Sequence, residues 1–355
     1  MEFSEYLGLK DRRRDSLEPD PERDTDLYVD LDGLVPRSMA QLAARAPKLV
    51  LMGDYGTGKT HLIHVLQALT DKNRFESVYL KLEPFGRWAE SRHLHDALLS
   101  ALETNGRFEK SIPADSEAMP KDLRVAFGLL RENPGNPDAR AWLLARGPTP
   151  AKARKLGFSA PLAQTARGVT YAAIWRFMAD AFRVNTGREI LFLIDESETF
   201  QEQVDQTRAA DMGVAIREMF DKGNQSFGVV MGLTAPKGRV GEFSSHPLGR
   251  PDVASRVQDI VIHLGRLDSP ERRRKFIFEL LGRLLQRPGT FLSAEAVDAL
   301  VVNGPAWVKS LSLIARDPVQ RDYVKLLNSI AKNAFRSRLE LPLVASSIPS
   351  HEGRL

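Results

Sequence analysis

The segment Gly53–Thr60 constrains this chain more than any other part of its sequence. It has the letters GDYGTGKT and matches the pattern G-x-x-x-x-G-K-[ST] without deviation. The apolar run Lys48–Met52 precedes it, and apolar residues at helical spacing follow it in HLIHVLQAL. A strand, a glycine-rich loop and a helix in this order present backbone N–H groups and a helix N-terminus to one anion. The segment therefore predicts an α/β fold with a parallel sheet and a loop that holds the phosphates of ATP.

Each residue type in this loop has a physical role. Glycines let the backbone curl so that its N–H groups point inward, Lys59 reaches the β- and γ-phosphates, and Thr60 offers a hydroxyl to Mg²⁺. We therefore predict that the nucleotide is held by the loop and the residue after it, namely Gly53, Asp54, Tyr55, Gly56, Thr57, Gly58, Lys59, Thr60 and His61.

A second apolar run, Ile190–Ile194, is typical of a buried parallel strand and leads directly into two acids. Asp195 is in the position to hold Mg²⁺, and Glu196 is in the position to polarise an attacking water, as in a Walker B arrangement. Thr234 follows a further buried run, Gly228–Leu233, and either orients the attacking water or caps the strand. Together with the glycine-rich loop, these residues predict an ATP hydrolase.

An arginine near the end of this region is a candidate for completing the site of a neighbouring subunit. Arg256 precedes the alternating run Val257–Leu264, which predicts a short strand. A guanidinium in this place suits an arginine finger. Arg239 and Arg250 are alternatives from the same region, and an ordinary surface arginine remains an equal interpretation.

The order of patterns along the chain predicts its organisation. Residues 1–26 are polar and charged and predict a flexible lead-in. Residues 27–265 predict the nucleotide-binding domain, with a mostly helical insertion at about 84–188. Helical patterns alone fill 266–340 and predict a small lid domain, and 341–355 predict a tail.

Composition narrows the functional classes. The 355 residues contain no cysteine, which excludes disulfides and thiol catalysis, and no apolar run long enough for a signal peptide or a membrane span. We expect a cytoplasmic protein. The net charge is +4, and residues 266–340 hold 14 Lys or Arg against 8 acids. This excess, with the run Arg272–Lys275 at the start of a helix, predicts either a DNA-phosphate contact or a solvated helix face.

The order of these elements resembles the AAA+ ATPases. The segment SRVQDIVIHL is similar to the initiator or origin-recognition branch of that family. Within it, GDYGTGKTHLIHVLQAL, WLLARG, ARKLGF and LFLIDESE resemble the ATP-binding proteins of BREX-type phage-defence systems. The resemblance extends from Tyr28 to Arg316. It implies an AAA+ P-loop fold with a helical lid, ATP and Mg²⁺ as ligands, and a site completed by another subunit.

The same resemblance implies partners and one departure. The implied partners are further copies of the chain in a ring or filament, double-stranded DNA, and other proteins of a defence or mobile-element system. The family's lid usually supplies an arginine in a G-x-x-R pattern, but here Gly304-Pro305-Ala306-Trp307 has tryptophan, and Lys309 is the nearest substitute. An alternative function is therefore a scaffold that binds ATP or ADP, turns over slowly and recruits a nuclease or transposase.

Overall fold

The computed structural model describes residues 1–82, 90–197, 206–221, 223–234, 251–287, 289–312 and 319–347. The chain forms two compact units. One unit contains residues 38–52 and 69–262, and the other contains residues 1–37, 53–68 and 263–355. Among the described residues, no helix combines the length and the apolar character needed to cross a membrane.

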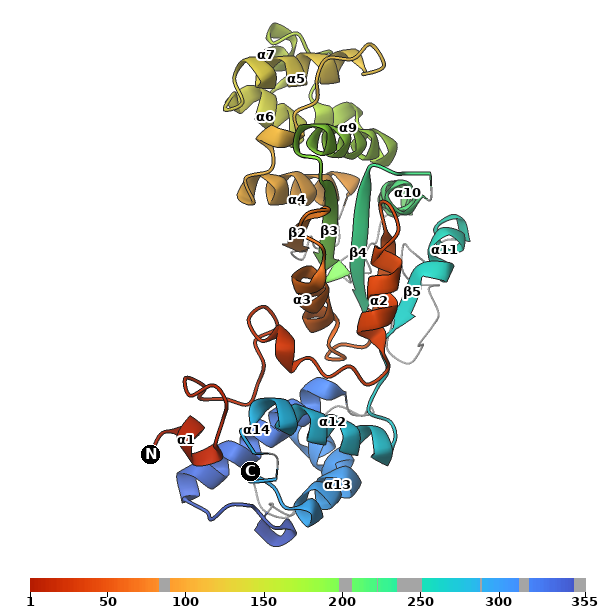
Figure 1. The fold of residues 1–355 in the computed structure, drawn as a ribbon. Helices are drawn as coiled ribbons and strands as arrows, with labels where there is room; N and C mark the ends of the chain where they lie inside the picture. The colour runs from red at the N-terminus through yellow and green to blue at the C-terminus, as the bar shows by residue number, and fades with distance from the viewer. Residues whose placement is uncertain are drawn as a thin grey trace. The chain divides into compact units, whose positions relative to one another are not determined.

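A five-stranded sheet with the order β2-β3-β4-β1-β5 organises the first unit (Figure 1). The strands are β1 (Lys48–Gly53), β2 (Phe75–Lys81), β3 (Glu189–Asp195), β4 (Phe227–Thr234) and β5 (Val261–His263). β2, β3 and β4 run parallel, with Val78 opposite Phe192 and Phe192 opposite Val229. Continuous apolar stretches such as Ile190–Ile194 form these strands because both faces of a parallel sheet are covered. The predicted α/β fold with a parallel sheet is confirmed.

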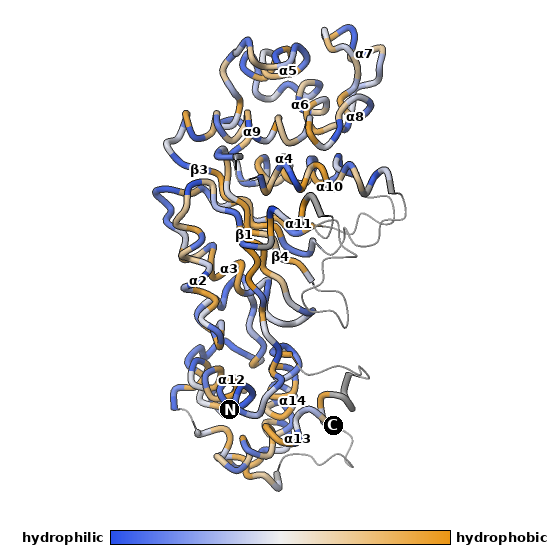
Figure 2. Tube along the Cα trace, turned by 90° about the vertical axis from the view of Figure 1, so that its right-hand side faces the viewer, coloured by the Kyte–Doolittle hydropathy of each residue, from blue (hydrophilic) through white to orange (hydrophobic). Residues whose placement is uncertain are grey.

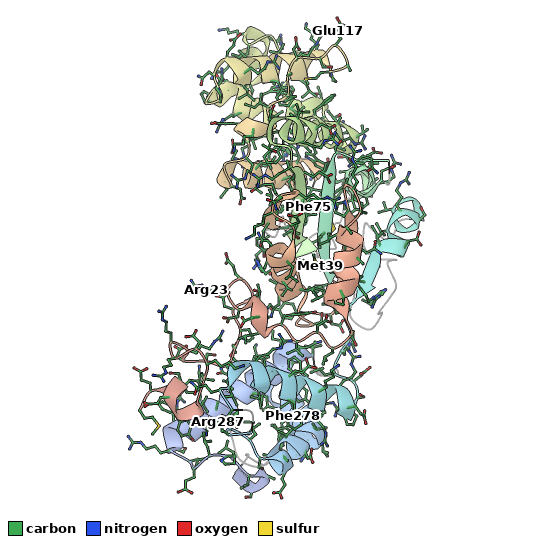
Figure 3. All side chains as sticks on the ribbon, viewed as in Figure 1. Arg23, Met39, Phe75, Glu117, Phe278 and Arg287 are labelled. Atoms are coloured by element: carbon green, nitrogen blue, oxygen red, sulfur yellow. The ribbon has the colours of Figure 1, made fainter. Side chains whose placement is uncertain are left out.

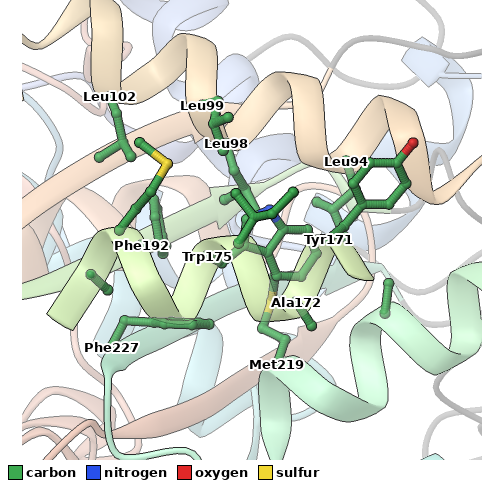
Figure 4. Packing of buried hydrophobic residues seen from close by; sticks show 14 of the residues in the cluster. Leu94, Leu98, Leu99, Leu102, Tyr171, Ala172, Trp175, Phe192, Met219 and Phe227 are labelled. Atoms are coloured by element: carbon green, nitrogen blue, oxygen red, sulfur yellow. The ribbon is translucent and has the colours of Figure 1, made fainter. Parts of the chain in front are cut away.

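The described residues between β2 and β3 form helices and connecting segments. The helices are α4 (Ser91–Thr104), η3 (Glu109–Ser111), α5 (Lys121–Glu132), α6 (Pro137–Leu143), α7 (Pro150–Lys155), α8 (Leu162–Thr165) and α9 (Gly168–Thr186). Leucines of α4 and the face of α9 that carries Tyr171 and Trp175 pack over Phe192 of β3 and Phe227 of β4 (Figure 4). One apolar core therefore joins the helical region to the sheet.

A buried histidine fixes the arrangement of three of these helices. His95 of α4 is fully buried, and its Nε2–H donates to the carbonyl of Leu143 at the end of α6, at 2.6 Å. Its Nδ1 accepts from Nε1–H of Trp175 in α9, at 2.9 Å. Burial lowers the pKa of His95 to about 4, so the ring stays neutral and both of its nitrogens stay bonded.

Before β5, the first unit contains helices in a segment where the sequence predicted the start of a longer strand. α10 (Gln206–Phe220) precedes β4, and α11 (Pro251–Val257) and η6 (Gln258–Ile260) precede β5. The predicted strand Val257–Leu264 is therefore wrong at its start, and only Val261–His263 are extended. Val253 and Val257 lie four residues apart and are both buried, which is the spacing of a helix face.

The second unit combines the N-terminal segment, the helix after the glycine-rich loop and the C-terminal helices. Its elements are α1 (Phe3–Leu7), η1 (Thr25–Leu27), the first residues of α2 (Leu34–Leu42), α3 (Lys59–Leu69), α12 (Pro270–Leu284), α13 (Ala294–Ser312), α14 (Gln320–Ser337) and η7 (Ala345–Ser347). Apolar residues of α12, α13 and α14 form its core, as the alternation of hydrophobic and hydrophilic segments along these helices indicates (Figure 2). Phe278 on α12 remains partly exposed (Figure 3).

The N-terminal segment differs from the flexible lead-in that its charges suggested. Phe3, Leu7, Leu9 and Leu17 are buried in the same core as the C-terminal helices. Asn328 of α14 anchors the segment further, because its side-chain oxygen accepts from the backbone N–H of Leu17 at 2.9 Å. These few apolar residues are widely spaced among charges, so the local sequence pattern does not indicate that they are buried. Their burial follows from packing against the C-terminal helices.

The C-terminal helices also differ in one boundary. A proline usually ends or kinks a helix, but α13 continues through Gly304 and Pro305 to Ser312. A Cβ atom at Gly304 would lie 2.8 Å from the hydroxyl of Tyr323, so glycine allows α14 to approach closely here. Leu343 of the expected tail is buried and pairs with Leu292, whereas 348–355 lie outside the described residues.

Candidate nucleotide site

The loop between β1 and α3 has the backbone that its glycines permit. Gly56 and Gly58 have φ angles of +86° and +90°, which L-residues with side chains rarely adopt. A Cβ atom at Gly53 would lie 2.6 Å from the hydroxyl of Thr57, so glycine allows the loop to close on itself. The Thr57 hydroxyl donates to the carbonyl of Asp54 at 2.8 Å. The loop is thus already curled before any ligand is considered.

Lys59 points back into this loop. Its ammonium donates to the carbonyls of Gly53 at 3.0 Å and Asp54 at 2.9 Å, and the residue is only 7% exposed. The loop carbonyls hold the positive charge beside the turn where phosphate oxygens are expected. Thr60, the second residue of α3, is partly buried next to it.

His61 is held by the N-terminal segment. Its Nε2 lies 2.8 Å from the carbonyl of Asp24 and donates to it, and burial lowers the pKa of this histidine. The Tyr28 ring lies edge-on to the imidazole, with 5.3 Å between ring centroids. Burial also raises the pKa of Tyr28, so its hydroxyl stays protonated. Residues that the sequence placed in a lead-in therefore form one wall beside the start of α3.

Two arginines contact the loop that sequence reasoning did not select. Arg266, three residues after β5, forms an ion pair with the carboxylate of Asp54. Arg321 is the second residue of α14, and its guanidinium lies over the Tyr55 ring, 5.0 Å from the centroid. The backbone N–H of Arg321 also donates to the carbonyl of Gly56 at 3.2 Å.

The expected position of a lid residue and the arginine that contacts the loop lie in different helices. The sequence Gly304–Trp307, where the lid residue was expected, lies inside α13, and Gly304 faces Tyr323 of α14. Lys309 is in the same helix, but its side chain lies outside the described residues. A search for arginines in the first turn of each C-terminal helix would have included Arg321, because such a turn can face a neighbouring loop.

A separate group of candidate residues, the acids at the end of β3, belongs to the unit that contains the sheet. Asp195 is 2% exposed, and its carboxylate accepts from the Tyr79 hydroxyl at 3.3 Å and from the backbone N–H of Glu196 at 2.9 Å. Lys81 lies opposite Asp195 in the β2–β3 register, and its ammonium pairs with the Glu196 carboxylate at 2.9 Å. Glu196 has a φ of +55°, which is uncommon for a residue with a side chain.

The remaining predicted residues lie at different edges of the sheet. Thr234 is the last residue of β4, the strand next to β3, so it shares the carboxyl-end edge with Asp195. Arg256 of α11 pairs with Asp221 at 3.4 Å, shortly before β4 begins and thus toward the opposite edge (Figure 1). Arg239 and Arg250 lie outside the described residues.

The described residues contain no group of three or more His, Asp or Glu side chains arranged to hold a metal. The donors that suit Mg²⁺ are the Thr60 hydroxyl and the Asp195 carboxylate, since Mg²⁺ prefers oxygen ligands and usually takes one or two from protein beside phosphate oxygens. Asp195 fits this role in its own surroundings, because its two hydrogen bonds fix the carboxylate in one orientation.

No protein-family model matches the chain, and no curated protein matches it. Solved structures with a similar fold include the ORC2 protein of Aeropyrum pernix in ADPNP–ADP complexes. It is 13% identical to this chain, with a TM-score of 0.47, and the alignment covers 96% of this chain and 71% of that chain. A Walker-type ATPase of Pyrococcus abyssi has 11% identity, coverages of 91% and 77%, and a TM-score of 0.40. Katanin has 15% identity, coverages of 94% and 72%, and a TM-score of 0.35. At these identities, residue roles rest on the side chains of this chain.

Proposed function

We propose that this chain is an AAA+-type ATPase that binds ATP with Mg²⁺ and hydrolyses it to ADP and phosphate. The observation that carries this proposal is the curled loop Gly53–Thr60, with the Lys59 ammonium held at its carbonyls. A buried lysine held by the carbonyls of a curled glycine-rich loop suits the polyphosphate of a nucleotide. The acids at the end of β3 supply a carboxylate for Mg²⁺ and a base for the attacking water, which a phosphate-binding loop alone lacks.

Each residue has a role in this proposal. Lys59 neutralises charge on the β- and γ-phosphates. Thr60 and Asp195 would hold Mg²⁺, which would supply charge withdrawal from the phosphate oxygens. Glu196 accepts a proton from the water that attacks the γ-phosphorus as the bond to the ADP oxygen breaks. Thr234 orients that water from the end of β4. Arg256 serves as the finger toward another copy only if its pair with Asp221 opens.

The finer proposals follow the resemblance of the sequence. Nucleotide binding changes self-association into a ring or filament, and the assembly acts on double-stranded DNA in the cytoplasm together with other proteins of a phage-defence or mobile-element system. Arg266 and Arg321 support a link between nucleotide and assembly, because both connect the C-terminal helices to the phosphate-binding loop.

The test combines turnover with mass. We expect Lys59→Ala to lose ATP binding and Glu196→Gln to retain ATP but lose hydrolysis by at least about 100-fold. Lys72→Ala, a substitution of a surface lysine in the turn before β2, is the matched control and should leave both unchanged. Size-exclusion mass with ADP and with a non-hydrolysable ATP analogue measures assembly. Hydrolysis that persists in Glu196→Gln would contradict the assignment of the base.

One observation favours the second candidate, a slow ATP- or ADP-binding scaffold. Lys81 pairs with Glu196, so the candidate base is engaged by a cation in this structure. Both side chains are more than a third exposed, so the pair is weak and opens readily in water. If it restrains turnover, Lys81→Ala raises kcat by several-fold with KM unchanged. Fast turnover of the unmodified protein with DNA, and no gain in Lys81→Ala, would exclude the scaffold.

A further inference from the structure

The helical region between β2 and β3 carries a second concentration of positive charge. From Ala139 to Arg188 the sequence contains nine Lys or Arg residues and a single acid, Asp180. This excess is denser than that of residues 266–340, where 14 basic residues face 8 acids. What matters for an interaction is how many of these charges remain available at the surface.

Most of the nine are engaged within the fold. Their carboxylate partners lie elsewhere in the same unit, in the pairs Arg140–Glu103, Arg146–Asp96, Lys152–Asp138, Arg176–Glu218, Arg183–Asp180 and Arg188–Glu76. Arg154 and Lys155 of α7 differ, since both are exposed and neither side chain has a hydrogen-bond or ion-pair partner among the described residues. The same holds for Lys121 and Arg124 at the start of α5.

The segment that follows α7 packs against the first turns of α5. The backbone N–H of Ser159 donates to the Asp122 carboxylate at 3.1 Å, and the Ser159 hydroxyl donates to it at 2.9 Å. A Cβ atom at Gly157 would lie 3.7 Å from Val125, so the chain after α7 runs directly against α5. We call Lys121, Arg124, Arg154 and Lys155, the four exposed basic residues without a described partner on these two helices, the α5–α7 patch; Figure 1 shows the helices that carry them.

The framework under the patch is rigid. Phe158 stacks on Trp142 with ring centroids 4.5 Å apart and an angle of 5° between the planes. The Trp142 indole N–H donates to the carbonyl of Ala160 at 2.9 Å, and Ala153 of α7 is fully buried. Charges on such a framework lose little conformational freedom on binding, apart from that of their own side chains.

The chemistry of the patch indicates its partner. The large aromatic residues of this region are buried, including Phe127, Trp142, Phe158 and Trp175. Binding of single-stranded nucleic acid relies on exposed aromatic rings that stack on bases, and the described residues of this region expose none fully. Lys and Arg without aromatic neighbours suit the regularly spaced phosphates of a duplex.

We propose that the α5–α7 patch binds the phosphate backbone of double-stranded DNA without reading its sequence. This proposal rests on the proposed function for the choice of DNA as partner, and it assigns the contact to the helical insertion instead of the run Arg272–Lys275. Four phosphate contacts predict a salt dependence with a slope of about −3.6 in a plot of log affinity against log salt.

The test uses the full-length protein and a short fluorescent DNA duplex, with anisotropy measured from about 50 to about 200 mM salt. The variant carries Lys121→Ala, Arg124→Ala, Arg154→Ala and Lys155→Ala. We expect its affinity at the lower salt to fall at least about tenfold and the salt slope to become shallower by about 3 to 4. The matched control, Arg274→Ala with Lys275→Ala on α12, should bind within about twofold of the unmodified protein.

Other outcomes separate this proposal from the proposed function. ATP binding and hydrolysis by both variants are measured alongside, and we expect them to be unchanged without DNA. Equal DNA binding by the fourfold variant, with hydrolysis intact, would overturn the patch and leave the ATPase standing. Absence of hydrolysis in the unmodified protein would overturn the ATPase while the patch is still measured without nucleotide.

Two competitors complete the design. Preference for a single strand over the duplex would contradict the proposal, because the patch then reads something other than regular phosphates. Polyglutamate is the second competitor for the fluorescent duplex. If it competes as effectively as DNA of equal charge, the proposal is contradicted and an acidic protein is the favoured partner. Unchanged thermal unfolding of the fourfold variant shows that lost binding reflects lost charge.

Discussion

The two basic regions of this chain differ in how many of their charges have partners, and the difference is the reverse of what their sequences suggest. Arg272–Lys275 on α12 are four consecutive basic residues, yet Arg272 binds the Asp32 carboxylate at 2.7 and 2.8 Å. Arg273 donates to three backbone carbonyls, Arg274 pairs with Asp298, and Lys275 lies 3.8 Å from Glu279. The α5–α7 patch is assembled from two short, separate segments, and none of its four side chains has such a partner among the described residues.

The difference teaches that free charge depends on where the fold places the acids. The acidic N-terminal segment and the basic C-terminal helices belong to the same unit, so each supplies partners to the other. Arg272 reaches Asp32, and Arg283 donates to the carbonyl of Asp26. In the helical insertion, Asp122 lies between Lys121 and Arg124 in the sequence but is engaged by Ser159. A run of like charges in sequence therefore marks a structural site as readily as a binding site.

The largest expected effect concerns the framework below the patch. Because burial lowers the pKa of His95 to about 4, below its ordinary 6.5, the unfolded chain binds the proton more readily. The free energy of unfolding should therefore fall by about 3 kcal/mol as the pH decreases from 6.5 to 4. Burial also lowers the pKa of His61 in the other unit. Because α12, α13 and α14 themselves contain no histidine, amide protection should decline in α4 and α9 before it declines there.

Hydrogen exchange across this pH range measures the effect, with protection factors corrected for intrinsic rates. In His95→Gln the ring no longer titrates, and the decline in α4 and α9 should diminish by a similar amount. Equal loss of protection in α9 and α12, or an unchanged decline in His95→Gln, would show that the two regions do not differ in this way.

The sequence was sufficient for the sheet and for the residues that follow its strands. Continuous apolar runs predicted β1, β3 and β4, because a strand buried on both faces needs apolar residues at every position. The motif GDYGTGKT also predicted the loop, since its glycines are required by backbone angles that depend on local chemistry alone. The roles assigned to Asp195, Glu196 and Thr234 remain predictions.

What the sequence missed depends on contacts between distant segments. Arg266 and Arg321 reach the loop only because the segment after β5 and the start of α14 pack beside it. The packing of Phe3 and Leu7, and the continuity of α13 through Pro305, depend on partner helices in the same way. Local periodicity describes which face of an element is apolar but not which element covers it.

The next largest effect tests the structural side of the comparison. We expect Arg272→Ala to lower the free energy of unfolding by about 2 kcal/mol, because the change removes a bidentate pair and leaves the Asp32 carboxylate half-buried without it. Arg124→Ala on α5, a matched arginine without a partner among the described residues, should change it by less than about 0.5 kcal/mol. Urea unfolding monitored by circular dichroism gives both values. Equal effects would remove the distinction between engaged and available charges.

A smaller effect distinguishes the position of the patch charges from their number. Ser159→Ala removes the hydroxyl bond to Asp122 and should lower the free energy of unfolding by about 1 kcal/mol. All four basic side chains remain, so DNA affinity should fall a few-fold while the salt slope stays the same. Ser159→Thr keeps a hydroxyl and should restore the affinity. A shallower slope in Ser159→Ala would mean that Ser159 itself contacts the partner.

The smallest expected effect comes from the exposed end of the α12 run. Arg274 and Asp298 are each about half exposed, and Lys275 is 3.8 Å from Glu279, so both pairs are screened by water. Replacing Arg274 and Lys275 together with alanine should therefore change the free energy of unfolding by no more than about 0.5 kcal/mol. DNA anisotropy and urea unfolding on the same sample measure both quantities. A drop in DNA affinity comparable to that of the fourfold patch variant, at unchanged stability, would move the DNA contact to α12, where the sequence indicated either a DNA contact or a solvated helix face.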